Sequence, residues 1–180
     1  MAADLIHRFA PGARPLTILA LHEEGANEND LLSICRAVAP GAAVISPRLP
    51  ATPAVLAEWL IAASARYSFE LSTVRALGYS SGGDLAVSTM LAHPGALPGA
   101  VLFRPRLAAR PKLIPQLFGA PVLLVAGSRD EHVALGDSEA LGRLLSEAGA
   151  SVDFAVVESD HGLTPHDFSL AKRWFAEKPA

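Results

Sequence analysis

Short apolar segments alternate with segments of helical periodicity along this chain, and this alternation limits the fold more than any other feature. Six segments are almost continuously apolar and rich in β-branched residues, which is typical of strands that are covered on both faces. They span residues 16–22, 43–46, 74–79, 99–104, 121–127 and 152–158, and residues 5–9 predict a further strand at an edge. The intervening segments predict helices over residues 29–39, 53–67, 81–92, 134–148 and 165–177.

Strands that alternate with helices form βαβ units, so the sequence predicts a mostly parallel sheet of about six to seven strands with helices on both faces, an α/β architecture. A chain of 180 residues with 51% hydrophobic content suits one domain, residues 1–180, with a sizeable core. In such sheets, ligands bind outside the carboxyl ends of the strands. Residues that follow strand ends are therefore the first candidates for a site.

Charge and cysteine content exclude several classes of partner. The 15 basic and 18 acidic residues give a formal net charge of -3, so we expect no nucleic acid partner. Cys35 is the single cysteine, which excludes an intramolecular disulfide and a cysteine-rich zinc site, and its apolar neighbours predict a buried, inert thiol. The N-terminal residues lack signal-peptide features and the apolar runs are short, so we expect a cytoplasmic protein without membrane insertion.

Residues 78–82, Gly-Tyr-Ser-Ser-Gly, match the pattern G-x-S-x-G at the junction of a predicted strand and a predicted helix. A nucleophile on such a turn has a strained backbone, and strand and helix approach each other closely on either side of it. Residues two positions before and after the serine must then be small, and Gly78 and Gly82 meet this requirement around Ser80. Ser80 is therefore the candidate nucleophile. The alternative is an ordinary loop in which a serine caps the helix.

A serine hydroxyl is a poor nucleophile and needs a base that an acid holds in place. Asp130 follows the strand 121–127 and His161 follows the strand 152–158, so both lie just past carboxyl ends of strands. The order Ser80, Asp130, His161 is that of α/β-hydrolases. His132 is the rival base. Glu131, next to Asp130, and Asp160, next to His161, are the rival acids.

Acyl transfer also needs donors for a developing oxyanion. The backbone N–H of Ser81, directly after the nucleophile, is one candidate, and the N–H of Glu24, in the loop after the strand 16–22, is the other. No metal or cofactor is expected. The segment Gly-Tyr-Ser-Ser-Gly-Gly lacks the spacing of a dinucleotide fingerprint, and the chain has no P-loop.

These segments together resemble the phospholipase/carboxylesterase family of α/β-hydrolases, in its bacterial branch related to acyl-protein thioesterases. The similarity covers ILALHEEGANENDLL, VRALGYSSGGDLA, VLFRPRL, VLLVAGSRDEHV and SDHGLTPHD, in the order and spacing of the family. The resemblance implies an α/β-hydrolase fold without a cap domain, with Ser80 as nucleophile, Asp130 as acid and His161 as base. It also implies Ser81 and Glu24 as oxyanion donors.

The chain departs from that family at two places. His22 is followed by Glu23 and Glu24 where the family has a glycine, and glutamate resists backbone conformations that glycine permits, so we expect an altered oxyanion loop. Residues 47–52 are a shortened version of a segment that helps to wall the acyl pocket, so we expect a more open site.

We therefore expect a serine hydrolase that cleaves small or short-chain carboxylic esters or thioesters through an acyl-enzyme. Its partner is a small-molecule ester, and a homodimer is compatible with the sequence. A scaffold that binds a small molecule or a partner with little turnover is the alternative from a different class. A hydrolase of another bond, such as a lactone or dienelactone, is a third interpretation.

Overall fold

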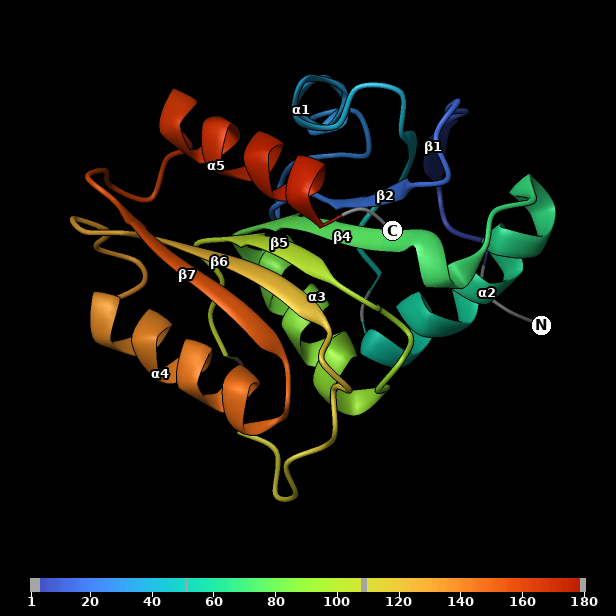
Figure 1. The fold of residues 1–180 in the computed structure, drawn as a ribbon. Coiled ribbons are helices and arrows are strands. Elements are labelled where there is room, and N and C mark those ends of the chain that lie inside the picture. Colours follow the sequence, from blue (N-terminus) through green and yellow to red (C-terminus); the bar gives the residue numbers. More distant parts are fainter. Residues whose placement is uncertain (1–3, 51, 108–109, 179–180) are drawn as a thin grey trace.

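The computed structural model describes residues 4–50, 52–107 and 110–178, in which seven strands form one sheet in the order β1-β3-β2-β4-β5-β6-β7 (Figure 1). Strand β1 pairs antiparallel with β3, and all other neighbours are parallel. The strands are β1 (His7–Ala10), β2 (Thr17–Leu21), β3 (Ala43–Pro47), β4 (Val74–Tyr79), β5 (Ala100–Phe103), β6 (Pro121–Gly127) and β7 (Ser151–Val157). The predicted mostly parallel sheet with an N-terminal edge strand is confirmed.

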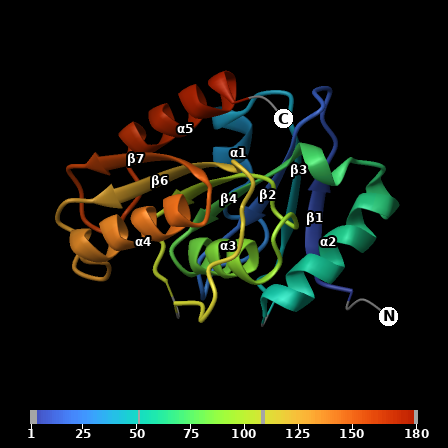
Figure 2. The same cartoon turned by 60° about the horizontal axis from the view of Figure 1, so that its bottom comes forward.

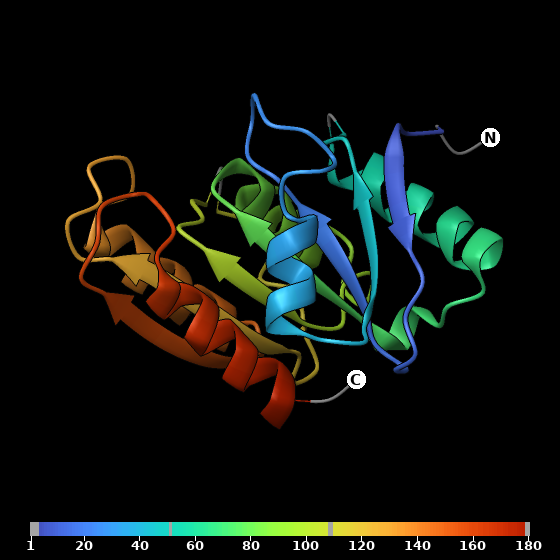
Figure 3. The same ribbon diagram turned by 90° about the horizontal axis from the view of Figure 1, so that it is seen from above.

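In the part of the chain that the structure describes, five α-helices cover the two faces of this sheet. Helices α1 (Leu32–Val38) and α5 (Pro165–Glu177) pack together on one face (Figures 1 and 3). Helices α2 (Pro53–Tyr67), α3 (Ser81–Ala92) and α4 (Leu135–Glu147) lie on the other face, and a short 3-10 helix, Leu71–Thr73, leads into β4. None of these helices is long and apolar enough to cross a membrane, among the residues described.

The predicted helix over residues 29–39 begins three residues later than expected, at Leu32. The preceding residues form a local turn instead: the Asn27 N–H donates to Asp30 Oδ2 at 2.7 Å, and the Asn29 N–H donates to Asn27 Oδ1 at 3.0 Å. Asparagine and aspartate side chains compete in this way with helical hydrogen bonds. The apolar periodicity was correct, but the start of the helix was wrong.

The core has two layers because successive side chains of a strand point to opposite faces of the sheet. In β2, Leu19 and Leu21 pack in the layer under α2, α3 and α4, whereas Ile18 and Ala20 pack in the layer under α1 and α5. Each layer contains one buried tryptophan, Trp59 or Trp174. The inner strands β2, β3 and β5 are therefore buried on both faces, as their apolar composition predicted.

Cys35 lies in the layer under α1 and α5, where it is fully buried. Burial disfavours the thiolate and raises the pKa of Cys35 to about 12. The prediction of an inert thiol agrees with this position.

The parallel strands end along one edge of the sheet, and this edge positions the candidate site. Strands β4, β6 and β7 end at Tyr79, Gly127 and Val157, and the loops that follow carry the three residues of interest. Figure 2 shows β7 at one margin of the sheet and β1 at the other. The parallel strands therefore bring together residues of loops that are up to 81 positions apart in sequence.

Candidate active site

Ser80 lies on a sharp turn between β4 and α3, with φ 52° and ψ -123°. Its backbone is fixed on both sides, because the Ser80 N–H donates to the Phe103 carbonyl at 2.9 Å and its carbonyl accepts from the Asp84 N–H at 2.9 Å. A positive φ in a residue other than glycine costs about 1–3 kcal/mol and persists only where surrounding structure holds it. The turn presents the Ser80 side chain at the carboxyl edge of the sheet.

The glycines on either side of Ser80 are required by close packing. A Cβ atom on Gly78 would lie 2.8 Å from the Gly83 Cα atom, and a Cβ atom on Gly82 would overlap the carbonyl oxygen of Leu21. The backbone of the first turn of α3 is thus in direct contact with the backbones of β2 and β4. This is the physical reason for small residues that the sequence motif indicated.

Three side chains form a continuous hydrogen-bonded chain at this edge. Ser80 Oγ lies 2.9 Å from His161 Nε2, and His161 Nδ1 lies 2.8 Å from Asp130 Oδ2. Asp130 is an acceptor, so the imidazole carries a proton on Nδ1, and the neutral ring accepts the Ser80 proton at Nε2. The structure therefore brings together Ser80, His161 and Asp130, in the arrangement that activates a serine hydroxyl.

Backbone N–H groups hold the Asp130 carboxylate. Its Oδ1 accepts from the His132 N–H at 2.8 Å and from the Val133 N–H at 2.9 Å, and its side chain is 1% exposed. Burial raises the pKa of Asp130, but the hydrogen bonds from His161, Val133 and His132 together lower it by more. The pKa of Asp130 therefore lies below its usual range, and the carboxylate stays ionised.

The rival residues do not join this chain. Glu131 and His132 are exposed, and His132 touches the site through its N–H and through an edge-on contact of its ring with that of His161 at 5.0 Å between centroids. Asp160 accepts the Gly162 N–H at 2.9 Å. It stabilises the turn that follows the imidazole.

Arg104 and Asp167 form a fully buried ion pair beneath the loop 159–164, which carries the imidazole. Arg104 Nη1 donates to Asp167 Oδ1 at 2.6 Å and Nη2 donates to Oδ2 at 3.0 Å. Arg104 Nη2 also donates to Ser159 Oγ at 2.8 Å, and the Thr164 N–H donates to Asp167 Oδ2 at 2.7 Å. The pair thus ties both ends of that loop to β5 and α5.

Sequence reasoning did not identify this ion pair. The available signal was an arginine, Arg104, at the end of an otherwise apolar strand, where a charge needs a buried partner. Tyr79 was also missed: its hydroxyl donates to the His161 carbonyl at 3.2 Å, and burial raises its pKa, which keeps that donor protonated.

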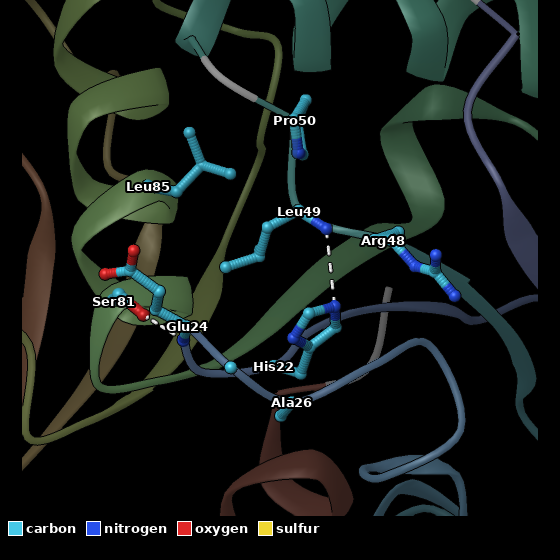
Figure 4. A pocket seen from close by; sticks show the side chains of 9 residues that line it. His22, Glu24, Ala26, Arg48, Leu49, Pro50, Ser81 and Leu85 are labelled. Atoms are coloured by element: carbon cyan, nitrogen blue, oxygen red, sulfur yellow. Dashed lines mark hydrogen bonds between the residues drawn. The ribbon is translucent and has the colours of Figure 1, made fainter.

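The oxyanion loop differs from the expectation in one respect. Neither Glu23 nor Glu24 has a positive φ; Gly25, with φ 85°, makes the turn. The expected backbone conflict of glutamate in this loop was therefore wrong. Glu24 is exposed and its N–H donates to Ser81 Oγ at 2.6 Å (Figure 4). The Ser81 side chain thus connects the start of α3 to the loop after β2.

His22 connects this loop to the segment after β3. Its Nδ1 donates to the Glu23 carbonyl at 2.7 Å. Its Nε2 accepts the Leu49 N–H at 3.3 Å, as Figure 4 shows. A pocket of about 480 Å³ opens beside these loops and Ser81. Its lining comprises His22, Glu24, Gly25, Ala26, Arg48, Leu49, Pro50, Ser81 and Leu85. The shortened segment 47–52 thus still supplies a wall through Leu49 and Pro50, while residue 51 lies outside the described residues.

The pocket is amphipathic. Leu49, Pro50 and Leu85 give it an apolar side, and Arg48, whose guanidinium pairs with Glu28 at 3.0 Å, stands at its margin. In the described part of the chain, no cluster of three or more His, Cys, Asp or Glu side chains could hold a metal ion.

The sheet topology, the strained serine between β4 and α3 and the hydrogen-bonded Ser80, His161 and Asp130 define an α/β-hydrolase. The chain belongs to the dienelactone hydrolase family, whose profile matches residues 50–172. It is therefore a hydrolase of the carboxylesterase and dienelactone hydrolase type.

Known proteins similar to this chain agree with that assignment. The carboxylesterase of Bacillus cereus is 30% identical, with a TM-score of 0.91 over 97% of this chain and 95% of that chain. The carboxylesterase of Mesorhizobium loti is 26% identical, with a TM-score of 0.89 over 99% of this chain and 100% of that chain. MhqD of Bacillus subtilis (strain 168), whose name describes it as a hydrolase, is 29% identical over 95% of this chain and 98% of its own length. The resemblance to carboxylesterases in the sequence is confirmed.

Proposed function

We propose that this protein cleaves carboxylic esters through an acyl-enzyme on Ser80. The observation that carries the proposal is the hydrogen-bonded chain from Ser80 Oγ through His161 to Asp130, at a turn whose strain presents the hydroxyl. A binding scaffold has no need of all three groups in this geometry.

The reaction follows from the positions of these atoms. Ser80 Oγ attacks the ester carbonyl carbon while His161 Nε2 takes the hydroxyl proton, and the carbonyl electron pair moves onto oxygen. The tetrahedral intermediate then expels the alcohol, to which His161 returns the proton. Water attacks the acyl-enzyme with His161 again as base, and Ser80 leaves as the hydroxyl. Asp130 stabilises the imidazolium in each half-reaction.

The backbone N–H groups of Ser81 and Glu24 are our proposed donors to the oxyanion. Two such donors at about 2.7–3.1 Å from the developing charge contribute most when they are oriented before the reaction. The Glu24 N–H supports this role because it lies next to the residue that follows the nucleophile: it donates to Ser81 Oγ at 2.6 Å. The substrate oxygen therefore has to replace the Ser81 hydroxyl as its acceptor.

Small or short-chain acyl groups are the proposed substrates. The pocket of about 480 Å³ has only a partial apolar wall, from Leu49, Pro50 and Leu85, and its margin carries the charged Arg48 and Glu24. A buried methylene gains roughly 0.8 kcal/mol, and a methylene beyond this wall gains less. We expect kcat/KM of p-nitrophenyl esters to level off or fall beyond butyrate, and a steep rise from C4 to C12 would contradict the proposal.

A fluorophosphonate probe tests the serine mechanism directly. We expect covalent labelling of the wild type at Ser80, located by peptide mass, and none in Ser80→Ala. Ser88→Ala, on the same helix, is the control and should label like the wild type. An unlabelled wild type whose circular dichroism shows an intact fold would favour the scaffold interpretation. Turnover of a lactone alongside open-chain esters would show whether cyclic esters are accepted.

A further inference from the structure

Strand β7 forms one margin of the sheet, between α4 and α5 (Figures 1 and 2). It pairs with β6 on one side, and no described strand pairs with its other side. The strand has seven residues, Ser-Val-Asp-Phe-Ala-Val-Val, without proline, glycine or lysine. Proteins usually protect such an edge by shortness, proline, lysine or a covering element. The opposite margin, β1, has only four residues.

Apolar side chains of β7 are exposed next to this free edge. Phe154 is 40% exposed and Val156 is 45% exposed. With the half-buried Val152 they occupy alternate positions, so all three lie on the face covered by α4. A hollow of about 460 Å³ beside them is lined by Val152, Phe154 and residues of α4. An apolar surface on an unpaired strand is a template for another strand.

The free backbone groups of the strand belong to the same three residues. The Ser151 N–H donates to Ala120 and the Val157 carbonyl accepts from Ser128, so residues 151 and 157 face the β6 side. Residues along a strand alternate in the direction of their backbone groups. The N–H and C=O groups of Val152, Phe154 and Val156 therefore point out of the sheet.

We propose that β7 pairs antiparallel with β7 of a second copy of this chain, with Phe154 opposite Phe154 of that copy, to form one continuous sheet. Phe154 is the midpoint of the strand, and the outward residues read Val-x-Phe-x-Val in both directions. In this register Val152 lies opposite Val156 of the copy. Three pairs of outward residues then exchange about six hydrogen bonds, two in each pair.

The charged side chains of β7 and of α4 are compatible with a second copy of the chain at this edge. In this register Asp153 lies opposite Ala155 of the copy, so no like charges face each other across the pair. Asp153 is also neutralised within its own chain by Lys178, with an oxygen–nitrogen distance of 3.8 Å. Helix α4 exposes both signs near the two-fold axis, with Glu139 and Arg143. An antiparallel α4 of the copy can pair opposite charges there, whereas a partner of one sign cannot satisfy both.

The proposed dimer leaves the candidate active sites open. The carboxyl end of β7 leads to His161, and antiparallel pairing places the two carboxyl ends at opposite edges of the joined sheet. Formation of this dimer therefore does not depend on the proposed catalytic roles.

Solution mass and one substitution test the interface. Light scattering coupled to size exclusion should give about twice the 18.8 kDa chain mass for the wild type. Phe154→Asp should give the mass of a single chain with unchanged circular dichroism. Ile61→Asp, at an exposed apolar residue of α2, is the control and should remain a dimer. A wild type with the mass of one chain at all concentrations up to the millimolar range would overturn the proposal.

Disulfide trapping tests the register. Opposed residues of an antiparallel pair have Cβ atoms about 4.5–5.5 Å apart, which a disulfide can bridge with small adjustments. We expect mild oxidation to convert Phe154→Cys into a covalent dimer, while Cys35 stays buried and unreactive. Val156→Cys should not cross-link to itself, because its copies lie about four residues apart along the strands, roughly 13 Å. It should cross-link when mixed with Val152→Cys. Efficient self-cross-linking of Val156→Cys, or none of Phe154→Cys, would contradict this register.

Discussion

The backbone and the side chain of Ser81 have opposite expected effects on the reaction rate. Its N–H is a proposed oxyanion donor, whereas its hydroxyl occupies the Glu24 N–H at 2.6 Å. A neutral hydrogen bond contributes about 0.5–1.5 kcal/mol, and a substrate oxygen has to compete with it. We expect Ser81→Ala to raise kcat/KM for p-nitrophenyl acetate by up to roughly tenfold, the equivalent of 1.4 kcal/mol.

Two further variants serve as controls for the Ser81→Ala prediction. Ser81→Thr keeps the hydroxyl and should stay near the wild-type rate. Ser80→Ala should lose about four to six orders of magnitude, as nucleophile removal does in serine proteases. A fall of a hundredfold or more in Ser81→Ala would show instead that the hydroxyl is needed to place the Glu24 loop.

Asp130 links the site to acid stability. Its pKa is lowered in the folded protein, so ionised Asp130 stabilises the fold above its unfolded pKa of about 3.9, and this contribution disappears as pH falls through the lower, folded value. The free energy of unfolding of Asp130→Asn should therefore lie below that of the wild type at pH 6, and the difference should shrink towards pH 3. Urea titrations at several pH values measure it. Glu131→Gln, at the exposed neighbour, should show no such trend, and a difference that is constant with pH would contradict the prediction.

The sequence was sufficient to predict those side chains whose position depends only on the end of one strand. Ser80, Asp130 and His161 follow β4, β6 and β7, and parallel strands end at one edge. Arg104 and Asp167 lie 63 residues apart, and their contact depends on how β5 meets α5 in space. Helical periodicity and strand composition contain no information on this tertiary contact between the end of β5 and the start of α5.

At the scale of elements, the Arg104–Asp167 pair joins β5, the loop that carries His161 and the start of α5. Loss of one partner of a buried pair leaves an uncompensated charge and costs about 3–5 kcal/mol. We expect Asp167→Leu to lower the free energy of unfolding by that amount in urea titrations. Arg129→Met breaks an exposed pair with Glu158 and is the control, at about 0–1 kcal/mol.

The double variant Arg104→Met/Asp167→Leu separates stability from positioning. Replacement of both charges by apolar side chains is often neutral for stability, so it should recover most of the loss. The loop, however, loses the hydrogen bond that Ser159 accepts from Arg104 and the one that Thr164 donates to Asp167. A displacement of about 1 Å at the imidazole can lower a rate by 10²-fold, so kcat should fall while KM changes little. A double variant with wild-type kcat would show that the pair acts on stability alone.

Local hydrogen bonds also decided where elements begin. The side chains of Asn27, Asn29 and Asp30 form the turn that delays α1, although the apolar stripe starts earlier. By contrast, Pro53 and Pro165 mark helix starts that the structure places at the predicted residues, because proline fits the first helical position. The start of a helix was thus predictable where a proline determines it. It was predicted wrongly where polar side chains compete with the helical hydrogen bonds.

At the scale of the whole molecule, two apolar layers sandwich one sheet, so neither layer can open without exposing the strands. Cys35 reports on this property because it is the single cysteine, fully buried between α1 and the sheet, with a pKa raised to about 12. Its reaction with a thiol reagent therefore requires opening of the layer under α1 and α5.

We expect this opening to be global unfolding, although α1 has only seven residues and no side-chain cap. Native domains are stable by about 5–15 kcal/mol, so the labelling rate of Cys35 in buffer should be at least roughly 10³-fold below that of the unfolded chain. The rate should rise with urea in parallel with the population unfolded by circular dichroism. Cys35→Ala/Ala62→Cys, with the thiol exposed on α2, is the control and should label at the rate of an unfolded chain. Fast labelling of Cys35 before the main transition would show that α1 opens on its own, and that the layer it covers is a separate cooperative unit.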